Sequence, residues 1–103
     1  MFINRVGAQF QCEGVTYTIG GKVCANDASD YEGLYGTITE IRDGDDRETE
    51  NDTPDIYCSF MPPVLADNIK AIESRFSQLY RREMHLEDIG LDIVIMAPDM
   101  LKV

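Results

Sequence analysis

The fold is decided by residues 36–42, which read Gly36-Thr37-Ile38-Thr39-Glu40-Ile41-Arg42. Polar and apolar side chains alternate along this stretch, as they do in a β-strand that buries one face. The two isoleucines lie three positions apart, however, so they cannot share one face of a regular strand. The spacing therefore predicts a β-bulge or a strand end near Glu40.

A hairpin is expected on the N-terminal side of this strand. Residues 8–12 and 15–19 alternate in the same way and are separated by Glu13-Gly14. A two-residue break that contains glycine, which adopts a positive φ without steric cost, is typical of a tight turn between paired strands. Residues 22–25 follow the hairpin and predict a third short strand.

Another strand is expected at residues 55–60, on the C-terminal side. Ile56, Cys58 and Phe60 alternate there, so they share one face. If Cys58 lies on the buried face, Tyr57 lies on the opposite face and is expected to be exposed.

The hydrophobic period changes at residues 66–82, where a single amphipathic helix is expected. Apolar residues recur there at three- and four-residue steps, and polar residues fill the other side. The apolar positions are Ile69, Ile72, Phe76, Leu79 and Tyr80. Residues 91–97 are apolar and rich in β-branched side chains, so they predict a C-terminal strand that is buried among the others.

These elements indicate an α+β fold. The chain has 103 residues, which is the size of one domain, so residues 1–103 are expected to form a single domain. Many short strands with glycine turns and one helix predict a small, strongly bent antiparallel sheet or an SH3-like barrel. The amphipathic helix would cover an opening or an edge, and the C-terminal strand would complete the sheet.

Two segments resemble the turn, loop and strand of SH3-like barrels of the KOW kind. They read Ile19-Gly20-Gly21-Lys22-Val23 and Tyr31-Glu32-Gly33-Leu34-Tyr35-Gly36-Thr37-Ile38-Thr39-Glu40-Ile41. The resemblance implies a barrel of a type often found on nucleic-acid machinery, in which glycines permit a sharp turn between two strands. The sign of the charge departs from that pattern, because Asp27, Asp30 and Glu32 occupy the loop where basic residues would help to hold phosphate.

The negative charge is concentrated in one part of the sequence. The net charge is -10, and residues 27–55 contain eleven acidic and only two basic residues. Residues 43–52 carry no aliphatic or aromatic side chain, so they are expected to form a solvated loop or ribbon that projects from the core. The acids of this segment are Asp43, Asp45, Asp46, Glu48, Glu50 and Asp52. In an extended ribbon, Glu48, Glu50 and Asp52 would point to one side as a ladder of carboxylates.

Several interpretations of this acidic segment stay open. It can be a solvated loop that keeps a small domain soluble, or a negative surface that meets a basic groove which normally holds nucleic acid. A calcium loop fits less well, because Arg47 stands where an oxygen ligand belongs and Glu48 where the turn glycine belongs. Tyr31 and Tyr35, which flank Gly33, are expected to be an exposed pair that adds to a recognition surface.

In its small size, its acidity and the stretch from Tyr31 to Phe60, the chain also resembles small acidic proteins of Gram-positive phages and mobile elements, the class that includes anti-CRISPR inhibitors. This resemblance implies a non-enzymatic binding protein that blocks the basic groove of a nucleic-acid-handling effector. The alternatives are an accessory barrel module of a mobile element with a solubilising acidic loop, and a small metal-binding protein. Direct binding of nucleic acid is not expected, because the charge has the wrong sign.

An enzyme is not expected. The one histidine, His85, lies in a polar turn after the helix, and no glycine-rich phosphate-binding loop precedes a helix. The carboxylates cluster in a solvated stretch, where little would shift their pKa values.

The three cysteines, Cys12, Cys24 and Cys58, show no CxxC spacing, so no disulfide framework is expected. Free thiols fit a reducing compartment, and neither a targeting signal nor a long apolar window is present, so we expect a cytoplasmic protein with no membrane partner. The thiols can simply pack in the core. Alternatively, closure of a barrel would bring them together, with His85 or a carboxylate completing a tetrahedral zinc site.

Overall fold

The structure is a computed structural model that describes all 103 residues. Its strands are β1 (Phe2–Ile3), β2 (Gln9–Cys12), β3 (Val15–Thr18), β4 (Lys22–Ala25), β5 (Tyr35–Arg42), β6 (Asp55–Phe60), β7 (Val94–Met96) and β8 (Leu101–Lys102). The one α-helix is α1 (Ala66–Tyr80), and three single-turn 3-10 helices are η1 (Gly44–Asp46), η2 (Leu86–Asp88) and η3 (Pro98–Met100). The expected α+β class with one α-helix is confirmed.

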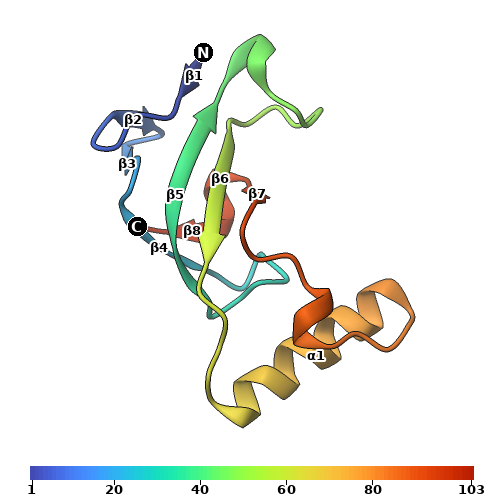
Figure 1. The fold of residues 1–103 in the computed structure, drawn as a ribbon. Coiled ribbons are helices and arrows are strands. Elements are labelled where there is room, and N and C mark those ends of the chain that lie inside the picture. The colour runs from blue at the N-terminus through green and yellow to red at the C-terminus, as the bar shows by residue number, and fades with distance from the viewer.

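All strand pairs are antiparallel, and β5 lies at the centre of the main sheet (Figure 1). The sheet has the order β7-β6-β5-β4-β8, with β1 paired to the second half of β5 beyond β4. The strands β2 and β3 form a separate two-stranded sheet, which is the predicted hairpin. Its turn residues Glu13 and Gly14 both have a positive φ, of 49° and 80°.

The main sheet is strongly bent but does not close into a barrel. Its two edge strands, β7 and β8, are connected by only four residues, 97–100. These strands stand at the two ends of the order β7-β6-β5-β4-β8, and in a flat sheet they would be about 19 Å apart. The sheet must therefore curl so that its edges approach. No hydrogen-bonded pair joins β7 to β8, so the expected SH3-like barrel is not confirmed.

The irregularity predicted near Glu40 is present. The register of β5 against β6 shifts between Ile38, which pairs with Cys58, and Glu40, which pairs with Tyr57. Because the bulge inserts one residue, Ile38 and Ile41 both point into the core, where they are 1% and 0% exposed. The odd spacing of the two isoleucines thus reflects a real feature of the strand.

The expected exposure of Tyr57 is wrong, because β6 is covered on both faces. Ile56, Cys58 and Phe60 face the hydrophobic core, as expected. Tyr57 is nevertheless only 5% exposed. It shares the other face of β6 with Asp55, whose carboxylate holds the chain segment that follows β5 against the sheet.

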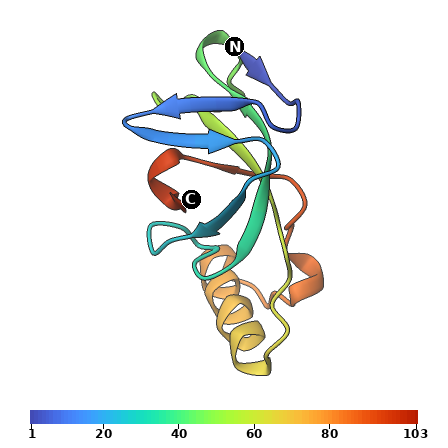
Figure 2. The same ribbon diagram turned by 90° about the vertical axis from the view of Figure 1, so that its left-hand side faces the viewer.

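The helix begins where expected but does not cover an opening or an edge of the sheet. It lies beyond the end of the sheet at which β6 finishes (Figures 1 and 2). Only Ile72 and Phe76 of its apolar positions are buried, and Leu79 and Tyr80 are 52% and 57% exposed. The helix packs on η2 and on the loop before β5, so the sheet itself supplies little of its partner surface.

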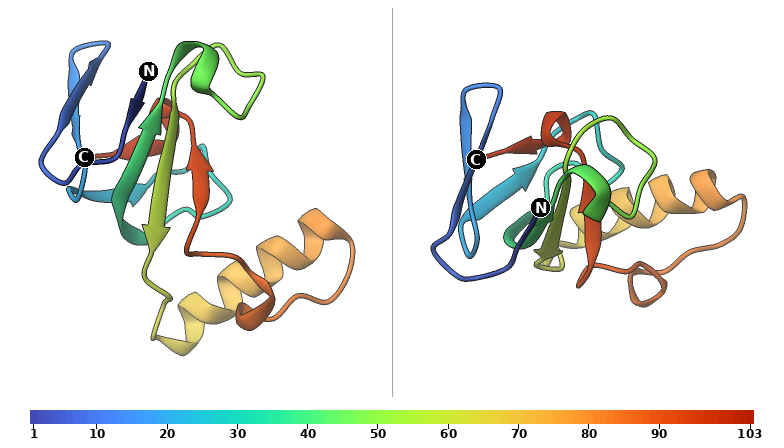
Figure 3. Two further views of the ribbon diagram at one scale, coloured as in Figure 1. Left: turned by 45° about the horizontal axis from the view of Figure 1, so that its top comes forward. Right: turned by 90° about the horizontal axis from the view of Figure 1, so that it is seen from above.

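The C-terminal strand is shorter and less enclosed than expected. Of residues 91–97, only Val94–Met96 form a strand, and this strand is an edge of the sheet paired with β6 alone (Figure 3). Ile93 is 78% exposed. The central places beside β5 are already occupied by β4, β1 and β6, so no interior position is left for β7. None of the helices combines the length and the apolar character needed to cross a membrane.

Candidate binding surfaces

The structure divides the acidic stretch 27–55 into two separate groups. Asp27, Asp30 and Glu32 precede β5, whereas the six acids of residues 43–52 follow it. The two groups are connected to opposite ends of β5, which has eight residues and is about 25 Å long (Figure 1). The negative charge is therefore not one continuous surface, and residues 43–52, which we call the acidic loop, form the denser group.

The amino terminus holds the first half of the acidic loop. The charged amino group of Met1 donates a hydrogen bond to the backbone carbonyl of Asp43 at 2.8 Å and pairs with the carboxylate of Asp46 at 2.6 Å. The carboxylate of Asp43 accepts a hydrogen bond from the backbone N–H of Gly44 at 2.8 Å, which caps η1.

Asp55 anchors the second half of the loop. Its carboxylate is 1% exposed and accepts hydrogen bonds from the backbone N–H groups of Glu48 (2.8 Å) and Thr49 (3.0 Å) and from the Thr49 hydroxyl. Burial alone would raise the pKa of Asp55, but the hydrogen bonds from Thr49 and Glu48, together with the charge of Arg47, hold that pKa below its usual value. The loop is thus folded against the sheet rather than projecting from the core as a free ribbon.

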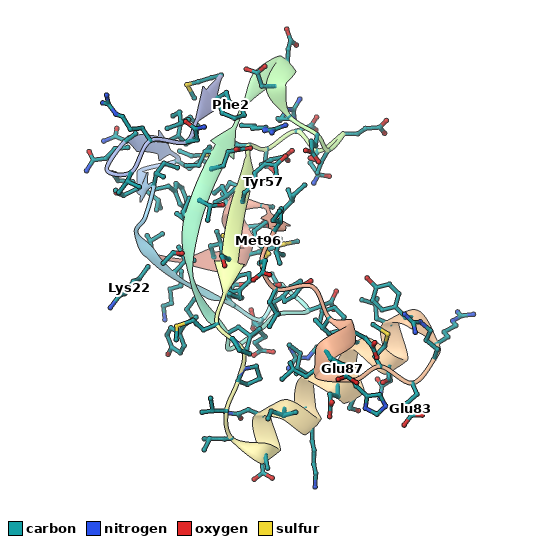
Figure 4. All side chains as sticks on the ribbon, viewed as in Figure 1. Phe2, Lys22, Tyr57, Glu83, Glu87 and Met96 are labelled. Atoms are coloured by element: carbon teal, nitrogen blue, oxygen red, sulfur yellow. The ribbon has the colours of Figure 1, made fainter.

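Arg42 lies beneath the acidic loop between two aromatic rings. Its guanidinium carbon is 4.9 Å from the centre of the Phe2 ring and 5.1 Å from that of the Tyr57 ring, which is cation–π geometry on both sides. The same group pairs with Glu40 at 2.6 Å and with Glu48 at 3.3 Å. Phe2 and Tyr57 both lie in the upper half of the molecule in Figure 4. Arg42 thus neutralises part of the negative charge of the acidic loop.

Tyr57 has an unusual environment in the same place. Its hydroxyl is buried and has no hydrogen-bond partner. Burial, helped by the nearby carboxylate of Glu48, raises the pKa of Tyr57 to about 12.

Only half of the acids in the loop are free. Asp43, Asp46 and Glu48 have the partners described above, whereas Asp45, Glu50 and Asp52 are exposed and make no hydrogen bond or ion pair. The expected ladder of Glu48, Glu50 and Asp52 is wrong, because residues 47–54 form no strand and Glu48 turns toward Arg42. Three carboxylates are therefore available to a partner.

The expectation of an exposed tyrosine pair is half wrong. Tyr35 is 67% exposed, but it lies at the start of β5, at the end of the strand away from the acidic loop. Tyr31 instead is partly buried and packs against the core: its ring stacks on Phe60 at 5.6 Å and meets the edge of Phe76 at 5.0 Å. Its hydroxyl donates to the carbonyl of Gly90 at 3.0 Å, so Tyr31 joins the helix to the sheet.

The candidate zinc ligands are not brought together. No group of three or more His, Cys, Asp or Glu side chains is placed to hold a metal ion. Cys58 is fully buried in the core, where burial raises its pKa to about 12. Cys12 lies on the separate β2–β3 sheet, and Cys24 alternates with the buried Val23 and Ala25, so it faces away from the core. The barrel closure that would have gathered the thiols does not occur.

His85 lies at the other end of the molecule from these thiols, after α1. Its Nδ1 is 3.8 Å from a carboxylate oxygen of Glu73, and its Nε2 is 3.5 Å from one of Glu83. Its backbone N–H donates to the carboxylate of Asp88 at 3.1 Å, which helps to form η2. These contacts give His85 a place in the turn that follows the helix.

One surface was missed by the sequence analysis. A groove of about 390 Å³ lies between residues 32–35, residues 61–65 and one side of α1, and we call it the apolar groove. Four large apolar side chains on its walls are strongly exposed: Tyr35 (67%), Met61 (70%), Val64 (86%) and Leu65 (64%). The available signal was the run of apolar residues around Pro62-Pro63, just before the helix.

In comparisons with protein-family models, with curated proteins and with solved structures, nothing was found to match this chain.

Proposed function

We propose that this chain is a non-enzymatic binding protein whose acidic loop docks against a basic groove of a partner protein. In the most concrete form of this proposal, the groove belongs to an effector that handles nucleic acid, and the chain blocks it as anti-CRISPR-type inhibitors do. The observation that carries the proposal is the set of three free carboxylates, Asp45, Glu50 and Asp52, on a loop that Asp55 ties to the sheet.

The sign and the position of the charge support this choice of partner. A chain with a net charge of -10 gains no electrostatic binding energy from the phosphates of a nucleic acid, because binding would bring like charges together. A basic protein surface, by contrast, is attracted over a distance, and this attraction raises the association rate more than it raises the final affinity. The densest group of acids, the acidic loop, lies at one end of β5 in an elongated molecule of 38 × 26 × 21 Å, so this end can face a basic partner as it approaches.

The local structure of the loop supports docking as well. Met1 and Asp55 hold the loop backbone through the contacts described above, and Arg42 holds the side chain of Glu48. A loop that is already ordered loses less conformational entropy when it binds than a free ribbon would. The backbone that carries the free carboxylates is therefore held against the sheet before the partner arrives.

The proposal competes with the simpler view that the acidity only keeps the chain soluble. If the acidic loop docks on a partner, removing charge from the loop should weaken binding more than removing the same charge elsewhere. If the acidity only confers solubility, the position of the removed charge should make no difference to binding. We compare Asp45→Asn/Glu50→Gln/Asp52→Asn, the loop variant, with Asp27→Asn/Glu87→Gln/Asp92→Asn, the control variant. Both remove three exposed carboxylates without an ion pair, but those of the control lie at the other end of the sheet or beside the helix, where Figure 4 shows Glu87.

The test is displacement of labelled DNA or guide RNA from a panel of purified RNA-guided nucleases and other basic nucleic-acid enzymes. The proposal predicts that the chain and the control variant release the nucleic acid from at least one enzyme, and that the loop variant does so more weakly. Equal behaviour of the two variants, or no release from any enzyme, would contradict it.

A further inference from the structure

The chain exposes more surface than a monomer of its mass normally does. Its accessible surface is 6698 Å² for a mass of 11.6 kDa. The scaling seen for monomeric proteins gives about 5,800 Å² at this mass, so the excess is roughly 850 Å². This is close to the area of about 800 Å² that each partner contributes to a protein–protein interface of standard size.

Four of the eleven large apolar side chains that are strongly exposed line the apolar groove. Tyr35, Met61, Val64 and Leu65 come from two chain segments that meet there, joined by a hydrogen bond of 2.8 Å from the Met61 N–H to the Tyr35 carbonyl. Ala71 also lines the groove, and its small side chain lets another backbone approach α1 closely. A continuous apolar surface of this kind is typical of a binding interface.

The apolar groove carries no net charge, although the chain as a whole is strongly acidic. Its only charged lining residues are Glu32 and Arg75. The acidic loop is at the opposite end of β5, about 25 Å away, which is several times the screening length of about 8 Å at physiological ionic strength. Asp27 and Asp30 lie at this same end of β5, and the backbone carbonyl of Asp30 accepts a hydrogen bond from Arg75 at 2.6 Å. Two copies that meet at this face therefore keep their acidic loops apart, with only the smaller acidic group beside the interface.

From the excess surface, the exposed apolar side chains and the neutral charge, we infer that the apolar groove is the interface at which a second copy of this chain docks. In a symmetric dimer both copies use the same patch, so every contact between two different residues occurs twice, once in each direction. Glu32 of one copy can then pair with Arg75 of the other, and the reverse pair forms as well. The two acidic loops stay outside the interface. The inference does not depend on the proposed function.

The test uses one substitution at two sites. Val64→Asp places a carboxylate in the apolar groove, and Val6→Asp places the same carboxylate on a valine that is equally exposed, 81% against 86%, but lies outside the groove. Sedimentation velocity over a range of micromolar concentrations measures the dimer dissociation constant of each protein. We expect a dimer for the unmodified chain and for Val6→Asp, and at least about a hundredfold weaker association for Val64→Asp, because two unpaired carboxylates would be buried at the interface.

Circular dichroism establishes that each variant is folded, and Met61→Glu provides the same test if Val64→Asp does not fold. A chain that sediments as a monomer throughout would overturn the inference and would leave the groove to a different protein. A dimer that Val64→Asp and Met61→Glu leave intact would also overturn it, because the interface would then lie elsewhere.

Discussion

Asp55 is the residue on which the shape of the acidic loop depends most. In the sequence it is one acid among eleven in residues 27–55, and its place at the start of the predicted strand 55–60 does not show that its carboxylate is buried. In the structure Asp55 is 1% exposed and accepts three hydrogen bonds, whereas Asp52 is exposed and accepts none. The partners of Asp55 lie six and seven residues away, in a segment without a periodic pattern, so local sequence rules cannot identify them.

Replacement of this anchor should destabilise the fold and free the loop. We expect Asp55→Ala to lower the free energy of unfolding by about 2–3 kcal/mol, because three donors lose a buried charged acceptor. Asp52→Asn should change it by less than about 0.5 kcal/mol. Urea unfolding at neutral pH measures both values. Equal stability of the two variants would mean that the loop does not depend on Asp55.

The same residue predicts a dependence of stability on pH. Its pKa is lower in the folded chain than in the unfolded chain, so its contribution is fully present above the unfolded value of about 3.9 and is lost as the pH falls through the folded value. The stability of the unmodified chain should therefore fall more steeply below pH 4 than that of Asp55→Asn, as measured by urea unfolding at each pH. Parallel pH curves would contradict this assignment.

Cys58 provides an independent test of the core. Its pKa is raised to about 12 by burial, whereas Cys12 and Cys24 are partly exposed. In the native chain a thiol reagent should label Cys12 and Cys24 and should label Cys58 at least about a thousandfold more slowly, at a rate set by unfolding. Mass spectrometry of the labelled peptides measures the three rates. Rapid labelling of Cys58 without denaturant would show that the core is open.

At the scale of elements, the features that depend on neighbours in the sequence were predicted, and those that depend on distant contacts were not. The β2–β3 turn and the bulge near Glu40 follow from spacing within a few residues. Tyr31 and Tyr57 were predicted to be exposed because the segments that cover their side chains lie far from them in the sequence. Tyr31 is covered by α1 and β6, and Tyr57 by a loop whose polar sequence gives no sign of packing.

The pairing of β5 with β6 depends on one glycine. A Cβ atom added at Gly36 would lie 2.3 Å from the Ser59 carbonyl oxygen and 2.9 Å from the Phe60 Cα, so the two strands would have to separate. We expect Gly36→Ala to lower the free energy of unfolding by about 2–4 kcal/mol. Gly90→Ala is the matched control, because no atom lies within 4 Å of its added Cβ. Thermal or urea unfolding that shows equal stability for both variants would contradict the observed packing of these strands.

At the scale of the whole molecule, charge and apolar surface are separated. The acidic loop lies at one end of β5, and α1 lies beyond the other end (Figures 1 and 3). The apolar groove lies beside α1 and the start of β5. The sequence placed the charge correctly along the chain, and the strand predicted at residues 36–42 already lay between the two groups of acids. The stretch 27–55 was nevertheless treated as one acidic surface, because its arrangement in space depends on how that strand packs. It also could not show the groove, which forms only when residues 32–35 meet residues 61–65.

The central claim is that the acidic loop leads the approach to a basic partner. The most direct measurement is the association rate of the loop variant and of the control variant with an enzyme identified by displacement, over a range of salt concentrations. We predict that the loop variant associates about tenfold more slowly at low salt and with a flatter salt dependence, because steering depends on the charge that faces the partner. The control variant should stay within about twofold of the unmodified chain. Equal rates and equal salt dependence for the two variants would contradict the claim.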